Sequence, residues 1–287
     1  MRWARVCVEA IGYELPDERV TTQRLEGQLE PLYGALHLEA GQVEALTGIL
    51  ERRFWPKDPR MADCAARAAE KALAASGVPA AELGAVIYAG VCRDNLEPAT
   101  ACAVAERLGT GPDALVFDVS NACLGVLNGI VELANRIELG QMRAGIVVAA
   151  ESAREIVDAS IARMNADPTL ERYRLGLATL TGGSGAVAVV LTEAGFSDSE
   201  HRLVAAAAQS APEHHRICRW GPARGLLGET ANQMDTDASQ VLTHGVALGR
   251  RTWQRFLDAA SWSTAEVTPE ALKLSPTWRA NKLRLRC

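Results

Sequence analysis

The sequence has few lysines and no long apolar run. Only four of its 30 basic residues are lysine, and the formal net charge of the 287 residues is −5. A dominant surface for nucleic acid or anionic membrane is therefore not expected. No apolar run approaches the ~18 residues that a transmembrane helix needs. The longest runs, such as Gly145–Ala150 and Ala186–Leu191, suit buried strands.

Cysteine patterns that bind metals or form disulfide frameworks are also missing. The seven cysteines, an odd number, include no CxxC or CxxH pair. This argues against a zinc site or any other metal centre, and against a disulfide framework. Residues 1–5 do not begin a basic segment followed by an apolar stretch, so we expect no export signal. The sequence therefore predicts a protein of the reducing cytoplasm.

Helical and strand patterns alternate along the chain. The expected helices cover 58–77, 98–108, 124–139 and about 237–260, and the expected strands cover 85–92, 114–119, 144–150, 185–191 and 203–209. Continuous apolar strands separated by helices are typical of a mostly parallel sheet with both faces covered. The helix over 124–139 is apolar almost all round in its first half, which predicts burial. The chain length suggests about two domain-sized units.

The segment 118–125 carries the chemistry. It ends an expected strand and opens an expected helix, so Cys123 lies at a helix N-terminus. The free backbone N–H groups and the helix dipole there favour a thiolate, which acyl transfer from a thioester requires. From position alone, Cys123 could equally be a small buried hydrophobic residue. Cys64, Cys92 and Cys102 lack such a junction, and we expect them in the core.

Four short motifs follow one another in order. They are Thr47-Gly48-Ile49 with Arg52-Arg53, Pro98-Ala99-Thr100-Ala101 with Leu108-Gly109, Phe117-Asp118-Val119 through Ala122-Cys123, and Gly182-Gly183-Ser184-Gly185-Ala186. Together they resemble the thiolase-fold condensing enzymes of the β-ketoacyl-ACP synthase III group, over residues 1 to about 265. The resemblance implies an α/β protein with a thiolase-like, five-layered α/β/α/β/α fold of two similar halves.

Three segments carry a closer resemblance. Residues 93–98, 120–124 and 180–185 resemble the head-to-head acyl-CoA condensing thiolases of long-chain olefin biosynthesis. In that family one fatty acyl-CoA acylates the cysteine. A glutamate that reaches across the dimer interface deprotonates the second acyl-CoA, and Claisen condensation gives a β-keto acid. The resemblance thus implies a homodimer with Cys123 as nucleophile and Glu97 as base. Coenzyme A thioesters are its substrates, and no further cofactor is needed.

Glu97 also fits this chemistry physically. A condensation without decarboxylation needs a base for a weakly acidic C–H, whereas loss of CO₂ from a malonyl group makes the carbanion without one. The alternative is that Glu97 merely precedes a helix and interacts with its positive end.

The C-terminal part departs from the resemblance. The family uses a histidine and an asparagine there to stabilise developing negative charge, and the histidine's place falls near Lys273. His244 is expected to be an ordinary helix residue. Residues 277–287 resemble nothing in the family. We therefore expect a nucleophile-carrying half over 1–180 and an incomplete half over 181–287, truncated or frame-shifted after about 265.

A second departure concerns the clamp on the adenine of coenzyme A. The tryptophan and arginine of the synthase III group fall near Gln42 and Leu46 here, so that clamp is absent. Trp55 and Arg53 are nearby and could replace it, or could be ordinary surface residues.

Three functions therefore remain in view. The favoured one is an acyltransferase that joins two fatty acyl thioesters through an acyl-cysteine, giving a β-keto acid or a β-ketoacyl product. The second is a decarboxylating β-ketoacyl-ACP synthase III that uses malonyl-ACP, with acyl-CoA or acyl-ACP as donor. The third is a catalytically impaired dimer subunit that lacks the histidine and asparagine pair.

Overall fold

The strands and helices come from a computed structural model, which describes residues 1–222 and 232–267. The strands are β1 (Val6–Glu14), β2 (Glu18–Thr21), β3 (Glu51–Phe54), β4 (Ala85–Tyr88), β5 (Leu115–Asp118), β6 (Ala144–Glu151), β7 (Gly185–Glu193), β8 (Cys218–Pro222) and β9 (Asn232–Thr236). The helices are α1 (Thr22–Glu26), α2 (Glu30–Leu36), α3 (Gln42–Thr47), α4 (Met61–Ser76), α5 (Thr100–Leu108), α6 (Gly125–Glu138), α7 (Arg154–Ala166), α8 (Leu170–Gly176) and α9 (Ala238–Ala260).

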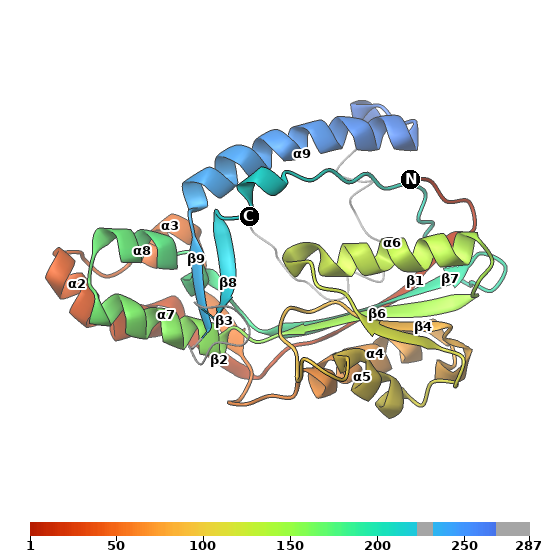
Figure 1. The fold of residues 1–287 in the computed structure, drawn as a ribbon, viewed down its shortest axis with the longest axis horizontal. Helices are drawn as coiled ribbons and strands as arrows, with labels where there is room; N and C mark the ends of the chain where they lie inside the picture. The colour runs from red at the N-terminus through yellow and green to blue at the C-terminus, as the bar shows by residue number, and fades with distance from the viewer. Residues whose placement is uncertain (223–231, 268–287) are drawn as a thin grey trace.

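The main sheet is mixed, with the strand order β1-β7-β6-β4-β5. Strand β4 runs parallel to β5 and β6, whereas β7 runs antiparallel to both of its neighbours. The expectation of a mostly parallel sheet is therefore wrong for β7. Helices α7 and α8 follow β6 without returning along the sheet (Figure 1), and β7 starts with Gly185 paired to Glu151 at the end of β6. Because the chain re-enters the sheet at the same end at which it left, β6 and β7 must be antiparallel.

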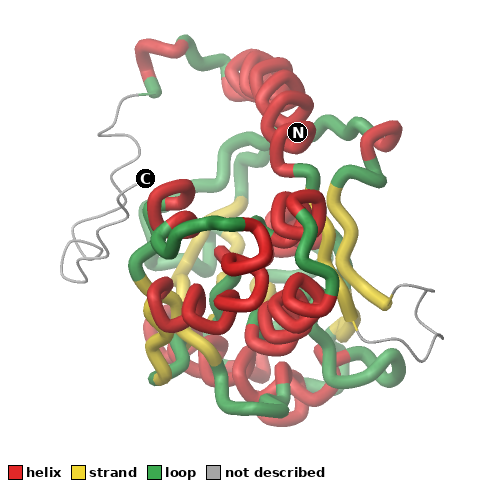
Figure 2. The backbone as a smooth tube through the Cα atoms, turned by 90° about the vertical axis from the view of Figure 1, so that its left-hand side faces the viewer, coloured by secondary structure: helices red, strands yellow, loops and turns green. Residues whose placement is uncertain are grey.

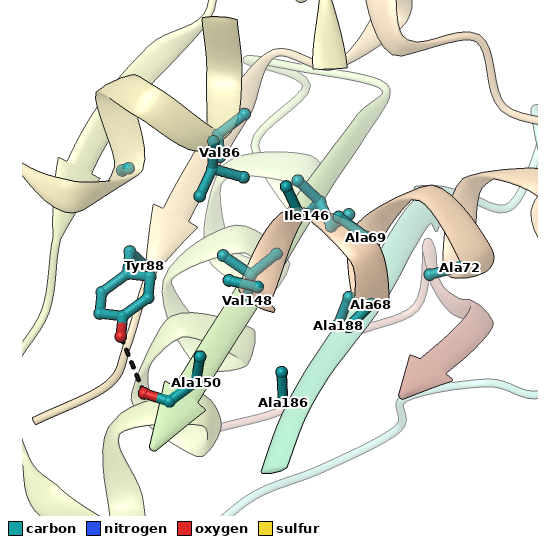
Figure 3. Close-up of a cluster of buried hydrophobic side chains, with 14 of the residues drawn as sticks. Ala68, Ala69, Ala72, Val86, Tyr88, Ile146, Val148, Ala150, Ala186 and Ala188 are labelled. Carbon is teal, nitrogen blue, oxygen red and sulfur yellow. Dashed lines mark hydrogen bonds between the residues drawn. The ribbon is translucent and has the colours of Figure 1, made fainter. Parts of the chain in front are cut away.

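Helices cover both faces of this sheet. Helices α4 and α5 lie on one face and α6 on the other (Figure 1). Small side chains let α4 approach closely: Ala68 and Ala69 are fully buried over Ile146 and Ala188 (Figure 3). Within the same cluster, the hydroxyl of Tyr88 donates a hydrogen bond of 2.8 Å to the carbonyl oxygen of Ala150.

A second group of elements lies at one end of the sheet. It contains the β2–β3 ribbon and helices α2, α3, α7 and α8 (Figure 1), with a core that includes Leu25, Leu32 and Val157. The β8–β9 ribbon leads into α9, which lies on the opposite side of the molecule from α4 and α5 (Figure 2). No helix within the described ranges is long and apolar enough to cross a membrane.

Most predicted elements are confirmed, and two further expectations are wrong. Residues 203–209 form no regular strand, although an isolated bridge joins Arg2 to Ala205 beside the start of β1. The first half of the helix over 124–139 is not buried, because Leu124 and Leu127 are 54% and 56% exposed. The helix has the apolar face that the sequence predicts, but nothing within the described chain covers this face.

Candidate active site

Cys123 lies in a tight turn between β5 and α6. Residues Ala122–Leu124 form one turn of 3₁₀ helix, and α6 begins directly after it at Gly125. Ala122 adopts a φ of +44°, which is uncommon for a residue with a side chain and costs backbone energy. The side-chain amide of Asn121 donates a 2.5 Å hydrogen bond to the side-chain oxygen of Asn128 in α6, which ties the turn to the helix.

Two glycines seat α6 on the sheet. A Cβ atom on Gly125 would lie 2.2 Å from the carbonyl oxygen of Ala89, just beyond the end of β4. A Cβ atom on Gly129, one turn later, would lie 2.7 Å from a methyl group of Val147. The helix can approach the sheet this closely only where it carries no side chain. This places Cys123 at the carboxyl ends of β4 and β5.

The structure gives the cysteines different environments. Cys123 is exposed. Cys64 is buried as expected, and burial raises the pKa of its thiol. Cys92 is half-buried, and burial strongly raises the pKa of its thiol as well. The expectation that Cys102 is a core residue is wrong: it lies on the outer face of α5 and is exposed.

Glu97 lies in the loop between β4 and α5, and its side chain is exposed. Strands β4 and β5 are parallel neighbours, with Tyr88 paired to Asp118. The loop after β4 and the Cys123 turn after β5 therefore both start at the carboxyl ends of these strands. Glu97 and Cys123 are therefore at the same end of the sheet, and both are open to the surface of the single chain.

A cavity of about 660 Å³ lies beside this end of the sheet. Its lining includes Leu96, next to Glu97, and Ser120, close to Cys123, but neither candidate catalytic residue itself. Trp220 of β8 closes part of the wall. Ser120 belongs to the segment that the sequence singled out. Sequence reasoning missed Trp220, because a cavity between elements far apart in the chain leaves no local pattern.

The substitutes for the adenine clamp do not fit that role. Trp55 is 3% exposed, and its ring N–H donates a 3.1 Å hydrogen bond to the carbonyl oxygen of Glu151. Arg53 donates to the carbonyl oxygen of Pro16 at 2.7 Å. The idea that Trp55 holds adenine, or is a surface residue, is wrong, because a buried ring cannot stack on a ligand.

Two of the described histidines, His214 and His244, contact each other. His244 lies in α9 and stacks on His214 with ring centroids 3.8 Å apart, so it is a helix residue as expected. The family's histidine place near Lys273 lies outside the described residues, as does the rest of 268–287. Within the described ranges, no group of three or more His, Cys, Asp or Glu side chains could hold a metal ion.

The fold is that of a thiolase-like condensing enzyme, because known structures of this class match it. A glutamate-to-glutamine variant of Xanthomonas campestris OleA superposes with a TM-score of 0.85 at 29% identity, covering 93% of this chain and 75% of that one. An OleA variant from the same organism with bound lauric acid and lauroyl-CoA gives 0.83 at 30% identity, covering 92% and 76%.

Sequence comparison gives the family. The acyl-CoA:acyl-CoA alkyltransferase of Shewanella oneidensis is 49% identical over 270 residues, which is 93% of this chain and 77% of that protein. The β-ketoacyl-ACP synthase III of Alkalilimnicola ehrlichii is 33% identical over 158 residues, or 55% and 46% of the two chains. No protein-family model matches. The chain belongs to the acyl-CoA:acyl-CoA alkyltransferase (OleA) family, which is related to β-ketoacyl-ACP synthase III.

Proposed function

We propose that the protein joins two fatty acyl-CoA molecules by Claisen condensation. The observation that carries this function is the 49% identity, over almost the whole chain, to an acyl-CoA:acyl-CoA alkyltransferase. A related OleA structure contains lauric acid and lauroyl-CoA, which supports long-chain acyl thioesters as substrates. The cavity of about 660 Å³ beside Leu96 and Ser120 is the proposed entry for such a chain.

Cys123 is the proposed nucleophile. Its thiolate attacks the thioester carbonyl of the first acyl-CoA, and the bond from that carbon to the CoA sulfur breaks. CoA leaves and takes up the proton that Cys123 gave up, so that an acyl-cysteine remains. The backbone N–H of Cys123 contributes to the site for the oxyanion formed in this step.

Glu97 is the proposed base for the second step. Its carboxylate removes an α-proton from the second acyl-CoA, and the carbanion attacks the acyl-cysteine carbonyl. The new C–C bond forms as the bond to the Cys123 sulfur breaks, giving a β-ketoacyl-CoA, and the Cys123 sulfur takes up the proton that Glu97 removed. Hydrolysis of its thioester by water yields the β-keto acid and CoA.

The positions of substituted residues in the OleA structures support this pair. A glutamate is replaced in one X. campestris structure and a cysteine in another, and these two residues are twenty-six positions apart. Glu97 and Cys123 have the same separation in this chain. Conserved spacing of this kind is expected when the residues act in one site.

We further propose that the protein is a homodimer built on the β5 edge of the sheet. Strand β5 is the last strand in the described sheet, and Leu115 in it is 43% exposed. Leu124, next to Cys123, and Leu127, in the first turn of α6, are also exposed. A two-fold pairing of β5 would cover this edge and bring the Glu97 of one protomer towards the Cys123 of its partner.

For the architecture of the whole chain, we keep the proposal that the sequence suggested. We propose two similar halves in five layers, with the first over about 1–180 and the second over 181–287. Strand β7, from the second range, completes the sheet of the first. The six described free cysteines, such as Cys7 and Cys218, favour a reducing compartment, and we propose the cytoplasm.

Product analysis separates the three functions. Purified protein is incubated with a long-chain acyl-CoA alone, or with the acyl-CoA and malonyl-ACP. A β-keto acid with two alkyl chains from acyl-CoA alone is the expected result. Product that requires malonyl-ACP would support the synthase III function. The observation in favour of that function is the 33% identity over 158 residues to a β-ketoacyl-ACP synthase III. A folded dimer with no product from either mixture would support the impaired subunit.

A further inference from the structure

The position of Glu97 depends on the segment that carries it. Its side chain is exposed, and it lies between the end of β4 and the start of α5. A base must be held within hydrogen-bonding reach of the proton it removes. The contacts that hold the backbone on either side of Glu97 therefore decide whether the base is in place.

Asp118 holds this segment on both sides. One oxygen of its carboxylate accepts a hydrogen bond of 3.0 Å from the backbone N–H of Thr100, and the other accepts one of 2.9 Å from that of Ala101. The Nε atom of Arg93 lies 3.7 Å from the same carboxylate. Arg93 is four residues before Glu97, whereas Thr100 and Ala101 are three and four residues after it.

The same residue belongs to the strand that leads to the nucleophile. Asp118 ends β5, five residues before Cys123, and pairs with Tyr88 at the end of β4. Its side chain is only 6% exposed. Helix α5 has no side-chain cap of its own at Ala99, so its first N–H groups depend on Asp118.

We propose that Asp118 is a positioning residue that fixes the Glu97 segment on β5, the strand across which Glu97 is proposed to reach the Cys123 of the partner. The inference rests on the proposed function, because it assumes that Glu97 is the base. A carboxylate that merely capped α5 would need only Thr100 and Ala101. The added contact to Arg93 fixes the other side of the Glu97 segment, which a helix cap does not require.

A matched control is available elsewhere in the chain. Glu26 is 4% exposed and likewise accepts from two backbone N–H groups, those of Gly41 at 3.1 Å and Val43 at 2.9 Å. Its contacts lie in the α1–α3 region and not at the Cys123 edge of the sheet. Loss of the Glu26 carboxylate therefore reports what removal of a buried backbone acceptor does to folding alone.

The test compares Asp118→Asn with Glu26→Gln in the full chain. Intact mass follows acylation of Cys123 by a long-chain acyl-CoA, and extraction measures β-keto acid formed per acylated chain. In Asp118→Asn we expect acylation within about two-fold of the unsubstituted protein. We expect product per acylated chain to fall about 10²-fold, the size of effect that a small misplacement of a reacting group produces. Glu26→Gln should lower both steps by the same factor, if at all.

Two results would overturn the inference. Equal losses in acylation and condensation for Asp118→Asn would mean that Asp118 is structural only, and unchanged product per acylated chain would mean that it does not position Glu97. Should Asp118→Asn fail to fold, Arg93→Gln removes the Arg93 contact alone and should still lower condensation several-fold without slowing acylation.

Glu97→Gln, measured in parallel, separates this inference from the proposed function. If Glu97→Gln condenses normally, then Glu97 is not the base and the proposed mechanism fails. If Glu97→Gln stops condensation while both Asp118→Asn and Arg93→Gln condense normally, only the role of Asp118 fails.

Discussion

Gly125 lies against Ala89 with no room for a side chain between them: a Cβ atom on Gly125 would be 2.2 Å from the Ala89 carbonyl oxygen. The contact joins the first turn of α6 to the chain just after β4. Because both partners are backbone, neither can move aside as a side chain could. The place of Cys123, two residues before Gly125, is therefore fixed by the packing of a helix on a strand.

Replacing Gly125 by alanine should displace this turn. We expect Gly125→Ala to lower the free energy of unfolding by about 1–3 kcal/mol, as overpacking of a tight site does. Acylation of Cys123 should slow at the same time. Chemical denaturation and intact-mass kinetics measure the two effects. Gly34→Ala in α2 is the control, because no atom lies within 4 Å of the added Cβ. Unchanged stability and acylation in Gly125→Ala would contradict the packing argument.

The cysteines should react in an order that exposure and pKa set. We expect acyl-CoA, or an alkylating agent, to modify Cys123 before Cys64, Cys92 or Cys102. Burial raises the pKa of Cys64 and Cys92, so that both remain protonated, and slow to react, at neutral pH. Their labelling should become faster only as the pH rises well above the usual range for a thiol.

Peptide mapping after brief labelling measures this order. Cys102 is the informative competitor, because it is exposed like Cys123 but lies on the outer face of α5. If Cys102 reacts first with acyl-CoA at neutral pH, exposure alone explains the labelling and Cys123 loses its assignment.

Glu97→Gln should separate the two chemical steps. Acylation of Cys123 should be nearly unchanged, because Glu97 acts only on the second acyl-CoA. Condensation should fall about 10²–10⁴-fold, the usual contribution of a general base. Glu106→Gln, an exposed glutamate on α5, is the matched control and should leave both steps intact. Slow acylation in Glu97→Gln would show that the residue acts on the first substrate instead.

The exposed leucines near Cys123 should hold the dimer together. We expect Leu127→Glu to weaken dimerisation, because Leu127 is 56% exposed on the proposed interface and a buried charge without a partner is costly. Leu139→Glu is the control: Leu139 is 73% exposed but lies just after the other end of α6. Light scattering at micromolar concentration measures both variants. An unsubstituted chain that is monomeric, or equal behaviour of the two variants, would contradict the interface.

The sequence determined the local features of this protein. Gly77, which the pattern placed at the end of a helix, adopts a φ of +68° as the C-cap of α4. The junction before Cys123 was likewise predicted from an apolar strand followed directly by a helical pattern, and the structure has both elements. These features depend on residues within about one turn of each other, so the sequence contains what is needed to predict them.

The tertiary structure alone decided what depends on distant residues. The direction of β7 follows from the path of the chain, which leaves the sheet after β6, forms α7 and α8, and returns at the same end of the sheet. The burial of Trp55 follows from its contact with Glu151, almost a hundred positions away. The exposure of Cys102 and the partners of Asp118 are of the same kind. An apolar residue is expected to be buried, and a buried acidic residue is expected to accept hydrogen bonds. Only the folded chain shows which surface covers the one and which N–H groups bind the other.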